Sequence, residues 1–272
     1  MEITKASGEK EPFKKDKLCR SLEAAGAPAS LVDETCKAVS EALVPGATTT
    51  EIWRRAQRYL VKKNLMVAAR YNTRHAIVAL GPAGFIFEQY IEALLKALGY
   101  TTKRNQIIPG QCVQHEVDVT AENGSQCFLI EAKYHNSFGT KVATDVVMYA
   151  DARREDIARA GRQCEMWVFT NTKFTANAVR YGKCRNLRLT GWHYPQEGGL
   201  EKLIIEHALY PVTVLPSVDR FAREQFARHN MILAQDVAPY TAAELLAQFG
   251  ISEKRGGKII REAQEVVYGK AA

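Results

Sequence analysis

The sequence predicts an α/β protein in which a mixed sheet is flanked by helices, with mostly helical segments before and after it. Three observations support this fold class. Residues 1–80 show helical hydrophobic spacing after two short extended pieces, residues 81–195 alternate helical and strand patterns, and residues 196–272 contain short helical patterns around prolines. At 272 residues, the chain is long enough for one large domain or two to three small ones. We therefore predict three domains at these boundaries.

Residues 1–80 begin with two predicted strands, at residues 3–5 and through Phe13, joined by a turn at Ser7-Gly8. Four helical patterns follow, and Thr50 is the predicted N-cap of the third. This segment has 14 basic and 9 acidic residues, within a chain of net charge +7. The excess indicates either an ordinary solvated face or an anionic ligand.

Residues 81–195 predict the mixed sheet. The breakers at residues 81–84 separate two helical patterns and mark a domain boundary. The order after them is helix, three strands, helix, strand, helix, strand, over about residues 83–98, 100–107, 112–120, 126–133, 140–160, 165–170, 174–183 and 187–192. This order is typical of a mixed α/β layer with helices on both sides.

Composition excludes several other classes. Apolar runs such as residues 77–80 are far shorter than the roughly 20 residues that span a bilayer, and the N-terminus lacks an apolar signal core. We expect a cytoplasmic protein without a membrane partner. The cysteines show no C-x-x-C pair and no zinc-ligand spacing, so we interpret them as reduced core thiols rather than metal ligands. They are Cys19, Cys36, Cys112, Cys127, Cys164 and Cys184.

The segment Glu122-Asn123-Gly124-Ser125 predicts a hairpin between the second and third strands of the sheet. Asn-Gly is typical of a two-residue turn, and that turn pairs Asp118 with Leu129 and Glu116 with Glu131. Because strand side chains alternate faces, four ionisable residues then share one face, with Asp118 and Glu131 as diagonal neighbours. They are Glu116, Asp118, Glu131 and Lys133. The other face is expected to be apolar, with Val117, Val119, Phe128 and Ile130. His115 alternates with the valines, which favours a structural role over a phosphate contact.

Crowded carboxylates repel one another unless a positive charge lies between them. Asp118 and Glu131 offer the oxygen ligands that Mg²⁺ prefers, and Mn²⁺ accepts similar ligands. A bound cation would lower the pKa of a water molecule and stabilise charge on a phosphate, while Lys133 can position that water or stabilise the phosphate charge in the transition state. The alternative is a solvated hairpin face with a surface Glu-Lys pair, because D-x(n)-E-x-K is a short pattern.

The helix before the hairpin supplies a further carboxylate. Glu88 falls on an otherwise apolar stripe with Phe85, Ile91 and Leu95. A carboxylate in that position is costly unless it has a partner. The alternative is a boundary glutamate that reaches solvent, since Glu92 lies close by.

The order of a helix with Glu88, a hairpin with Asp118, and Glu131-Ala132-Lys133 before another helix resembles the core of PD-(D/E)xK nucleases. It is most similar to the Mrr-like (type IV) restriction endonucleases, whose strand-helix unit after the active site resembles residues 167–175 here. The similarity covers residues 83–192. The approach to the hairpin at residues 110–116 departs from the glycine-rich form that is common in that family.

This resemblance implies a restriction-endonuclease-like fold. It also implies that the protein hydrolyses phosphodiester bonds of DNA. It implies that Asp118, Glu131 and the carbonyl of Ala132 hold Mg²⁺. Lys133 would assist the attacking water, and Glu88 would support the metal or orient Lys133.

Residues 1–80 resemble an ATP-cone, a small regulatory nucleotide-binding domain. The matching motifs are Lys5-x-x-Gly8, Glu11-Pro12-Phe13, Lys17-Leu18 and the segment 48–52. The resemblance implies ATP or dATP as a regulatory ligand, with Lys5, Glu11, Lys17 and Thr49 as its contacts. Ala6 replaces the usual basic residue, which removes one expected phosphate contact. The alternative is a helical interaction domain with ordinary surface lysines.

The C-terminal segment contains two predicted helices, at about residues 241–249 and 253–267. Residues 245–251 and 254–258 faintly resemble a helix-hairpin-helix, whose backbone amides contact a DNA phosphate. We favour a dimerisation or packing element, in line with the neutral charge of this segment.

These patterns together predict a Mg²⁺-dependent endonuclease that acts on DNA, is regulated by ATP or dATP, and serves in defence against foreign DNA. The first alternative is a nucleotide-sensing DNA-binding regulator that does not cleave. The second is an assembly protein whose output is its oligomeric state. Cleavage of both strands would suit a dimer or a higher homo-oligomer, since each site handles one phosphodiester.

Overall fold

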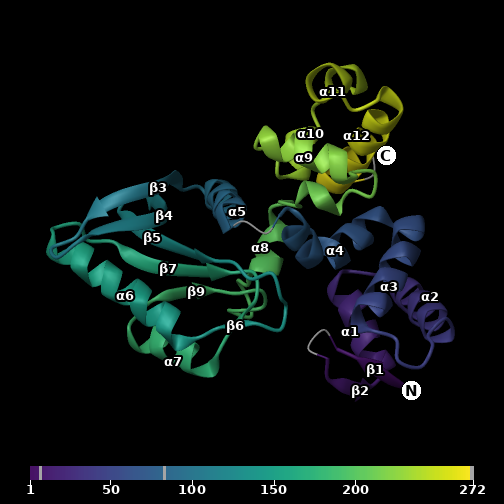
Figure 1. Cartoon of the computed structure of the whole chain (residues 1–272), viewed down its shortest axis with the longest axis horizontal. Helices are drawn as coiled ribbons and strands as arrows, with labels where there is room; N and C mark the ends of the chain where they lie inside the picture. Colours follow the sequence, from purple (N-terminus) through teal and green to yellow (C-terminus); the bar gives the residue numbers. More distant parts are fainter. Residues whose placement is uncertain (6–7, 82–83, 270–272) are drawn as a thin grey trace. The chain divides into compact units, whose positions relative to one another are not determined.

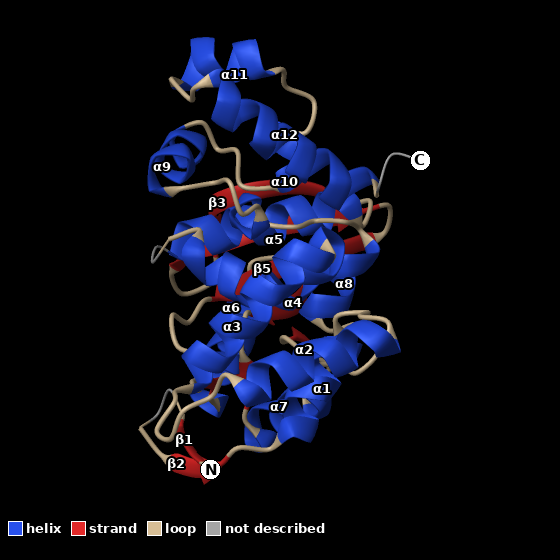
Figure 2. Cartoon of the chain, turned by 90° about the vertical axis from the view of Figure 1, so that its right-hand side faces the viewer, coloured by secondary structure: helices blue, strands red, loops and turns tan. Residues whose placement is uncertain are grey.

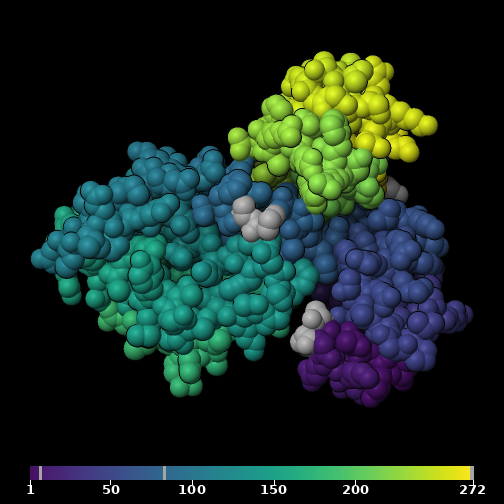
Figure 3. Space-filling model, in the orientation of Figure 1, coloured from purple at the N-terminus to yellow at the C-terminus, as the bar shows by residue number. Residues whose placement is uncertain are grey.

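The computed structural model describes residues 1–5, 8–81 and 84–269. The chain forms two compact units, which we call the terminal unit (residues 1–76 with 210–272) and the sheet unit (residues 77–209). Figure 1 labels their elements, and Figure 3 shows the chain as a space-filling view in the same orientation, with the sheet unit coloured from blue-teal to green. Three interpretations, the missing phosphate contact at Ala6, the turn at Ser7 and the boundary at residues 82–83, lie outside the described residues.

The sheet unit contains a five-stranded mixed sheet in the order β3-β4-β5-β7-β9. Neighbours from β3 to β5 are antiparallel, and those from β5 to β9 are parallel. The strands are β3 (Thr101–Pro109), β4 (Gln114–Asn123), β5 (Gln126–Lys133), β7 (Glu165–Thr170) and β9 (Arg188–Thr190). The mixed sheet predicted from the strand patterns is therefore confirmed.

Helices lie against this sheet. α5 (Gly84–Ala97) contacts β3, β4 and β5. α6 (Thr144–Arg159) and α7 (Ala176–Cys184) lie along the side of the sheet that Figure 1 shows below the strands. Their buried side chains join those of the sheet in one apolar cluster, which includes Val147, Ala150 and Ile157 of α6, Ala178 of α7, and Leu129, Met166 and Val168 of the strands. Burial of this apolar surface anchors α6 beside the end of β5.

The predicted helix over residues 140–160 begins later than expected. Residues Lys141–Val142 form a short strand, β6, which pairs in parallel with β8 (Lys173–Phe174). Two-residue strands carry no period that a sequence pattern can reveal. The backbone N–H of Thr175 donates to the carbonyl of Val142 at 2.9 Å, so this small sheet ties the start of α6 to the start of α7.

The terminal unit begins with the antiparallel strands β1 (Glu2–Thr4) and β2 (Lys10–Pro12), the short red pair beside the N-terminus in Figure 2. The next four helices are α1 (Lys15–Ala24), α2 (Ala29–Glu41), α3 (Thr49–Lys63) and α4 (Leu65–Ala79). Apolar residues at helical spacing bury one stripe of each of the first three, including Leu22, Val39 and Leu60. The two strands and four helices expected here are present.

The N-cap of α3 differs from the prediction. Thr48, not Thr50, is the cap, because its hydroxyl accepts the Glu51 N–H at 3.1 Å and Glu51 returns a bond to the Thr48 N–H at 2.7 Å. This is a reciprocal capping box, which satisfies two backbone donors at once. Both threonines precede the apolar period, so periodicity alone could not separate them.

The last segment is helical. It contains α8 (Leu200–Glu206), which belongs to the sheet unit, and then η1 (Val212–Val214), α9 (Arg220–Arg228), α10 (Ala234–Val237), α11 (Ala242–Phe249) and α12 (Glu253–Tyr268). Gly250 ends α11 with a left-handed backbone (φ 67°), a conformation that favours glycine. A Cβ at Gly256 would meet Leu245 at 3.4 Å, so α11 and α12 pack closely.

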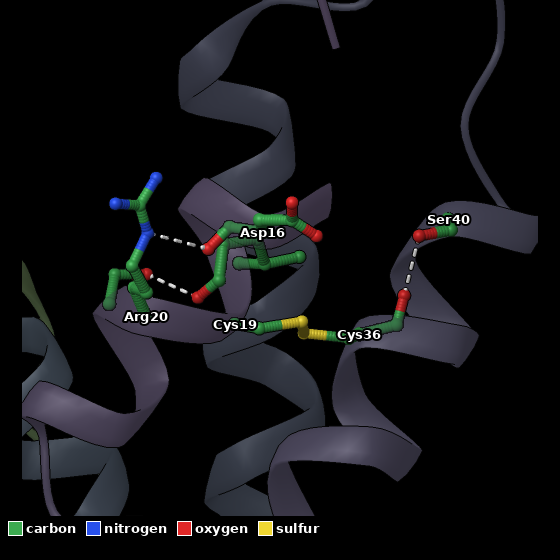
Figure 4. The surroundings of a disulfide bond; sticks show 7 residues. Asp16, Cys19, Arg20, Cys36 and Ser40 are labelled. Atoms are coloured by element: carbon green, nitrogen blue, oxygen red, sulfur yellow. Dashed lines mark hydrogen bonds between the residues drawn. A yellow bond between two sulfur atoms is a disulfide. The ribbon is translucent and has the colours of Figure 1, made fainter. Parts of the chain in front are cut away.

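The interpretation of the cysteines as reduced core thiols is wrong, because four of the six form disulfides and the other two lie outside the core. Cys19 of α1 is bonded to Cys36 of α2, as Figure 4 shows, and Cys127 of β5 is bonded to Cys164. Cys112 and Cys184 are exposed free thiols. Wide spacing in the sequence hid these pairs, because residues 17 and 37 positions apart meet only through tertiary packing.

Among the described residues, no helix combines the length and the apolar character needed to cross a membrane.

Candidate functional site

The β4–β5 hairpin has a different register from the predicted one. Thr120, rather than Asp118, pairs with Leu129, and Asn123 pairs with Gln126. The turn is therefore Gly124-Ser125, in which Gly124 has φ 58°. Glycine at the first central position is typical of a type II′ hairpin turn, whereas Asn-Gly would have required type I′. The shift is two residues, so Asp118 lies level with Glu131 instead of diagonal to it.

The regular pairing of β4 with β3 is interrupted at Asp118. Between β3 and β4, Arg104 pairs with Val119 and Gln106 pairs with Val117, and the pairing skips Asn105 and Asp118. Asn105 has a left-handed backbone (φ 51°), which is uncommon in a strand. Backbone irregularities of this kind gather at functional sites more often than elsewhere.

This irregularity changes which face the β4 side chains occupy. Val117 packs in the apolar cluster with Leu129, on the side of α6. Val119 pairs with Arg104, which instead reaches Glu92 of α5. The prediction that Val117 and Val119 share one face is therefore wrong, because the alternation of side chains is interrupted between them.

The Asp118 side chain accepts a backbone hydrogen bond at the point where the β4–β5 backbone pairing ends. The last paired residues of β4 and β5 are Val119 and Ile130, and the Ala132 N–H beyond them donates to Asp118 Oδ2 at 2.7 Å. The carboxylate thus satisfies a backbone donor that a strand carbonyl would otherwise accept. This contact brings Asp118 directly to the Glu131-Ala132-Lys133 segment.

Asp118 has a strongly perturbed pKa. Burial raises the pKa of its carboxyl group to about 7, and the negative charge of Glu131 adds to the effect, while the Ala132 amide opposes it. Near neutral pH, Asp118 is therefore only partly ionised, and its negative charge is not fully balanced by nearby positive charge. Such groups occur at functional sites more often than elsewhere.

Glu131 is paired with a residue that sequence reasoning missed. Arg153 of α6 donates from Nη1 to Glu131 Oε2 at 2.7 Å, and both side chains are largely buried. The Arg153 guanidinium also lies 5.0 Å from the ring centroid of the exposed Tyr149. A signal was present, since Val146, Ala150, Arg153 and Ile157 follow a helical stripe that is apolar except at Arg153.

Lys133 is exposed at the end of β5, where it pairs with Thr170 of β7. The chain beyond it is held by Asn171, whose side chain accepts the His135 N–H at 2.9 Å and donates to the His135 carbonyl at 2.7 Å. Burial, and then the charge of Lys133, lower the pKa of His135. Asn171 therefore supports the backbone that carries Lys133, a role that sequence reasoning also missed.

Glu88 is partly buried on α5, and its pKa is raised by burial and then by the charge of Glu116. Glu131 also raises it, whereas Arg104 opposes the shift. Four carboxylates therefore influence one another here, and we call them the carboxylate cluster. They are Glu88, Glu116, Asp118 and Glu131.

The apolar stripe predicted around Glu88 needs correction. Phe85 is 59% exposed, and the buried side of α5 consists of Phe87, Tyr90, Ile91, Leu94 and Leu95. Glu88 therefore borders the core instead of lying within it. Glu92, one turn further along α5, is paired with Lys96 and Arg104.

Among the described residues, no group of three or more His, Cys, Asp or Glu side chains is arranged to hold a metal ion. The donor chemistry of Asp118 and Glu131 still suits a hard divalent cation, since both are carboxylates and the Ala132 carbonyl follows directly. Burial, and then repulsion within the cluster, raise the pKa values of Glu88 and Asp118, and a bound cation would oppose both shifts.

His115 has a structural partner on α6. Its Nε2 lies 2.8 Å from Asp156 Oδ2, and the same carboxylate accepts the backbone N–H groups of Cys112 and Val113. These contacts, that of His115 first, lower the pKa of Asp156 to about 2. A phosphate contact by His115 is not needed to explain its position, which agrees with the structural role favoured from the sequence.

In the terminal unit, the residues expected to contact a nucleotide lie together. Glu11 is 3.1 Å from Lys17 and 3.3 Å from Lys5. Glu11, Lys17 and Thr49 line a cavity of about 160 Å³. Three aromatic side chains also line it, namely Phe13, Trp53 and Tyr71. Small-molecule sites usually exceed about 300 Å³, so this cavity would enclose only part of a nucleotide.

Residues 210–267 match the family model described as AF1548-like, C-terminal. An uncharacterized protein of Archaeoglobus fulgidus is 36% identical over 174 residues, which are 64% of this chain and 98% of that protein. The chain belongs to the family of this archaeal protein.

A solved AF1548-like structure supports the same relationship. The crystal structure of the protein of unknown function AF1548 matches 69% of this chain and 100% of its own, with 34% identity and a TM-score of 0.58. Can2 from Sulfobacillus thermosulfidooxidans, in complex with cyclic tetra-adenylate, is 15% identical over 73% of this chain and 64% of its own, with a TM-score of 0.35. That score is too low to support an argument about function.

Proposed function

We propose that this AF1548-like protein is a Mg²⁺-dependent endonuclease with a PD-(D/E)xK active site that cleaves DNA. The observation that carries the proposal is the meeting of Asp118 with Glu131-Ala132 at the end of the hairpin, where burial and like charge raise the pKa of Asp118 to about 7. A site that concentrates negative charge in this way is suited to a cation and, through it, to a phosphate.

Asp118, Glu131 and the Ala132 carbonyl would hold Mg²⁺ or Mn²⁺. Arg153 occupies only Oε2 of Glu131, and the Ala132 amide occupies only Oδ2 of Asp118, so each carboxylate keeps a second oxygen. The cation would supply an acidified water and charge stabilisation of the phosphate.

Side chains of the protein would stabilise charge and orient the groups that hold the cation. Lys133 is exposed two residues after Glu131, and its ammonium group would stabilise the charge that develops on the phosphate. The oxygen of the attacking water would bond to phosphorus as that water releases a proton to solvent. The P–O bond to the leaving oxygen would break, and the leaving oxygen would take up a proton from solvent. Arg153 would fix the orientation of Glu131, and Glu88 would support the cation or orient Lys133.

The terminal unit would regulate this activity as an ATP-cone. The aromatic side chains of the cavity, Phe13, Trp53 and Tyr71, suit a base, and Lys5 and Lys17 suit its phosphates. ATP or dATP would compete with Glu11 for these lysines. We propose a homo-oligomeric, cytoplasmic protein that acts against foreign DNA.

One observation favours a second candidate, a nucleotide-sensing DNA-binding regulator that does not cleave. The Arg153–Glu131 ion pair places a positive charge in the carboxylate cluster, where a bound cation would otherwise balance Glu131. If that pair persists when Mg²⁺ is present, the site would bind phosphate without hydrolysing it.

The test is cleavage of duplex DNA, single-stranded DNA and RNA by the full chain, with Mg²⁺, Mn²⁺ or a chelator. We expect metal-dependent cleavage of DNA, and a loss of about a hundredfold or more in Asp118→Asn and in Lys133→Met. Lys141→Met is the matched control, because Lys141 is an exposed lysine of the same unit. Failure of the wild type to cleave any substrate, with intact DNA binding, would favour the regulator.

Regulation is tested in the same assay with ATP or dATP added. We expect either nucleotide to change the rate of the wild type and to have a weaker effect on Lys17→Ala. An identical response of both proteins would remove the ATP-cone from the proposal and leave the nuclease unaffected.

A further inference from the structure

The α3 helix carries more positive charge than its fold requires. It contains five basic residues against one acidic residue. Its buried stripe consists of Ile52, Ala56 and Leu60, which pack in the core of the terminal unit. Arg55, Arg58 and Lys62 fall three and four residues apart, so they follow a second stripe along the same helix.

This second stripe forms one wall of a groove. α2 lies beside α3 (Figure 1). Side chains of both helices line an open hollow of about 270 Å³. We call it the α2–α3 groove, and its lining residues are Ala38, Val39, Ala42, Arg55, Arg58, Tyr59 and Lys62. The α2 side is small and apolar, the α3 side is cationic, and none of the seven lining residues is acidic.

Some other cations of the terminal unit pair with carboxylates, whereas exposed ones such as Lys10, Arg20 and Lys37 have no carboxylate within 4 Å among the described residues. Lys63 lies 3.1 Å from Glu34, which also accepts the Tyr59 hydroxyl, and Lys5 and Lys17 share Glu11. Within the part of the chain that the structure describes, Arg55, Arg58 and Lys62 have no carboxylate within 4 Å.

The nearest acidic residue on the same helix is already engaged. Glu51, one turn before Arg55, uses its carboxylate for the capping box with Thr48. Arg58 Nε donates to the Arg54 carbonyl at 3.3 Å, and the charge of Arg55 acts on Glu51 without a salt bridge. Three positive charges therefore converge on the groove without a salt-bridge partner among the described residues. Their mutual repulsion makes an anionic ligand favourable there.

The length of the cationic stripe selects among anionic ligands. Seven residues separate Arg55 from Lys62, which corresponds to about 10 Å along a helix axis. A single phosphate cannot contact both ends. A nucleic-acid strand carries one charge per roughly 3.4 Å of its axis, so about three consecutive phosphates match the stripe.

We propose that the α2–α3 groove binds the phosphodiester chain of a nucleic acid, with Arg55, Arg58 and Lys62 contacting successive phosphates. This deepens the proposed nuclease function, on which the choice of ligand rests, by adding a DNA contact outside the sheet unit. It would hold DNA independently of sequence, because phosphates carry no base information.

The experiment measures binding of a labelled 30-base-pair DNA duplex in chelator, over a series of salt concentrations. We expect Arg55→Gln/Arg58→Gln/Lys62→Gln to weaken binding at least tenfold. The slope of log affinity against log salt should shrink by about 2 to 3, because each lost phosphate contact contributes about 0.9. Lys10→Gln/Arg20→Gln/Lys37→Gln removes the same charge from exposed positions outside the groove and should change both quantities little.

A charge-retaining variant guards against a folding defect. Arg55→Lys/Arg58→Lys should keep most of the affinity and the salt slope. Equal binding by the triple glutamine variant and the wild type would overturn the proposal. Displacement of the duplex from wild type by ATP, with no effect of ATP on duplex binding in the triple glutamine variant, would also overturn it, because the groove would then hold a mononucleotide.

Failure of the nuclease proposal would look different. In that case duplex binding in chelator would still depend on the three cations, whereas no metal would support cleavage.

Discussion

Asp118 and Asp156 both contact the β4 region, yet their surroundings act on them in opposite directions. Asp156 accepts hydrogen bonds from two backbone amides and lies 2.8 Å from the His115 ring, and its pKa falls to about 2. Asp118 accepts the Ala132 amide but lies among other carboxylates in a buried position, and its pKa rises to about 7. The charge of one aspartate is compensated, and that of the other is not.

The difference separates a structural carboxylate from a candidate functional one. Asp156 fastens the turn between β3 and β4 to α6, where each of its contacts stabilises the ionised form. Burial and the charge of Glu131 make the ionised form of Asp118 costly in the folded protein. A ligand cation would remove that cost, so the comparison yields predictions for each aspartate.

The largest effect is expected at the compensated aspartate. Asp156→Ala leaves the amides of Cys112 and Val113 without their acceptor and frees the β3–β4 turn from α6. We expect a melting temperature lower by several degrees in calorimetry at pH 7. Asp33→Ala, an exposed aspartate on α2, is the control. An unchanged melting temperature would contradict the role given to Asp156.

The contact between Asp156 and the β3–β4 turn can also be disrupted by a substitution in the turn. A Cβ at Gly110 would lie 2.1 Å from Asp156 Oδ2 and 2.7 Å from the Val113 carbonyl oxygen. Gly110→Ala should therefore destabilise the protein by about 1–3 kcal/mol, the usual cost of overpacking. Gly139→Ala meets its nearest atom at 3.9 Å and should be close to neutral in the same denaturant titration. A similar decrease in the free energy of unfolding in both variants would argue against close packing of Gly110 on Asp156.

Asp118→Asn tests the uncompensated aspartate and should act with the opposite sign. A raised folded-state pKa favours the folded state at low pH, and this advantage is lost as pH rises from about 4 to about 7. Asparagine can still accept the Ala132 amide but never ionises. We expect a gain of about 1–2 kcal/mol in the free energy of unfolding at pH 8 and none at pH 4. A loss at pH 8 would show that the Asp118 charge stabilises the fold.

The smallest effect concerns the cation next to this site. Arg153 lowers the pKa of Asp118 by its charge, although less than burial raises it. Arg153→Gln should raise the pKa of Asp118 by less than about one pH unit, measured by carboxyl carbon NMR titration. A lower pKa in this variant would mean that Arg153 does not influence Asp118 as the structure indicates.

Much of the fold follows from local patterns in the sequence. β7 occupies residues 165–170 as predicted, and α12 lies within one residue of its predicted bounds, because both carry a strong apolar pattern with breakers outside it. β6 and β8 were missed, since two residues show no period. The disulfides Cys19–Cys36 and Cys127–Cys164 were missed because each joins distant segments.

The candidate site was predicted in part. Alternation within the hairpin indicated that Asp118 and Glu131 would be neighbours, and the structure brings Asp118 to the Ala132 amide beside Glu131. The exact partners depended on the turn, and Gly124-Ser125 moved the register by two residues. A register shift of one residue would have placed Asp118 on the other face of the sheet. Because the shift was an even number of residues, Asp118 and Glu131 remained neighbours.

By itself, the sequence determined the order of helices and strands and the positions of the acidic residues, because periodicity and turn chemistry act over a few residues. Only the tertiary structure decided which charges are compensated. Arg153 reaches Glu131 from 22 positions away and His115 reaches Asp156 from 41, whereas Asp118 has no cation as a direct partner among the described residues. Electrostatic energies depend on distance and burial in space, and neither quantity can be read along the chain.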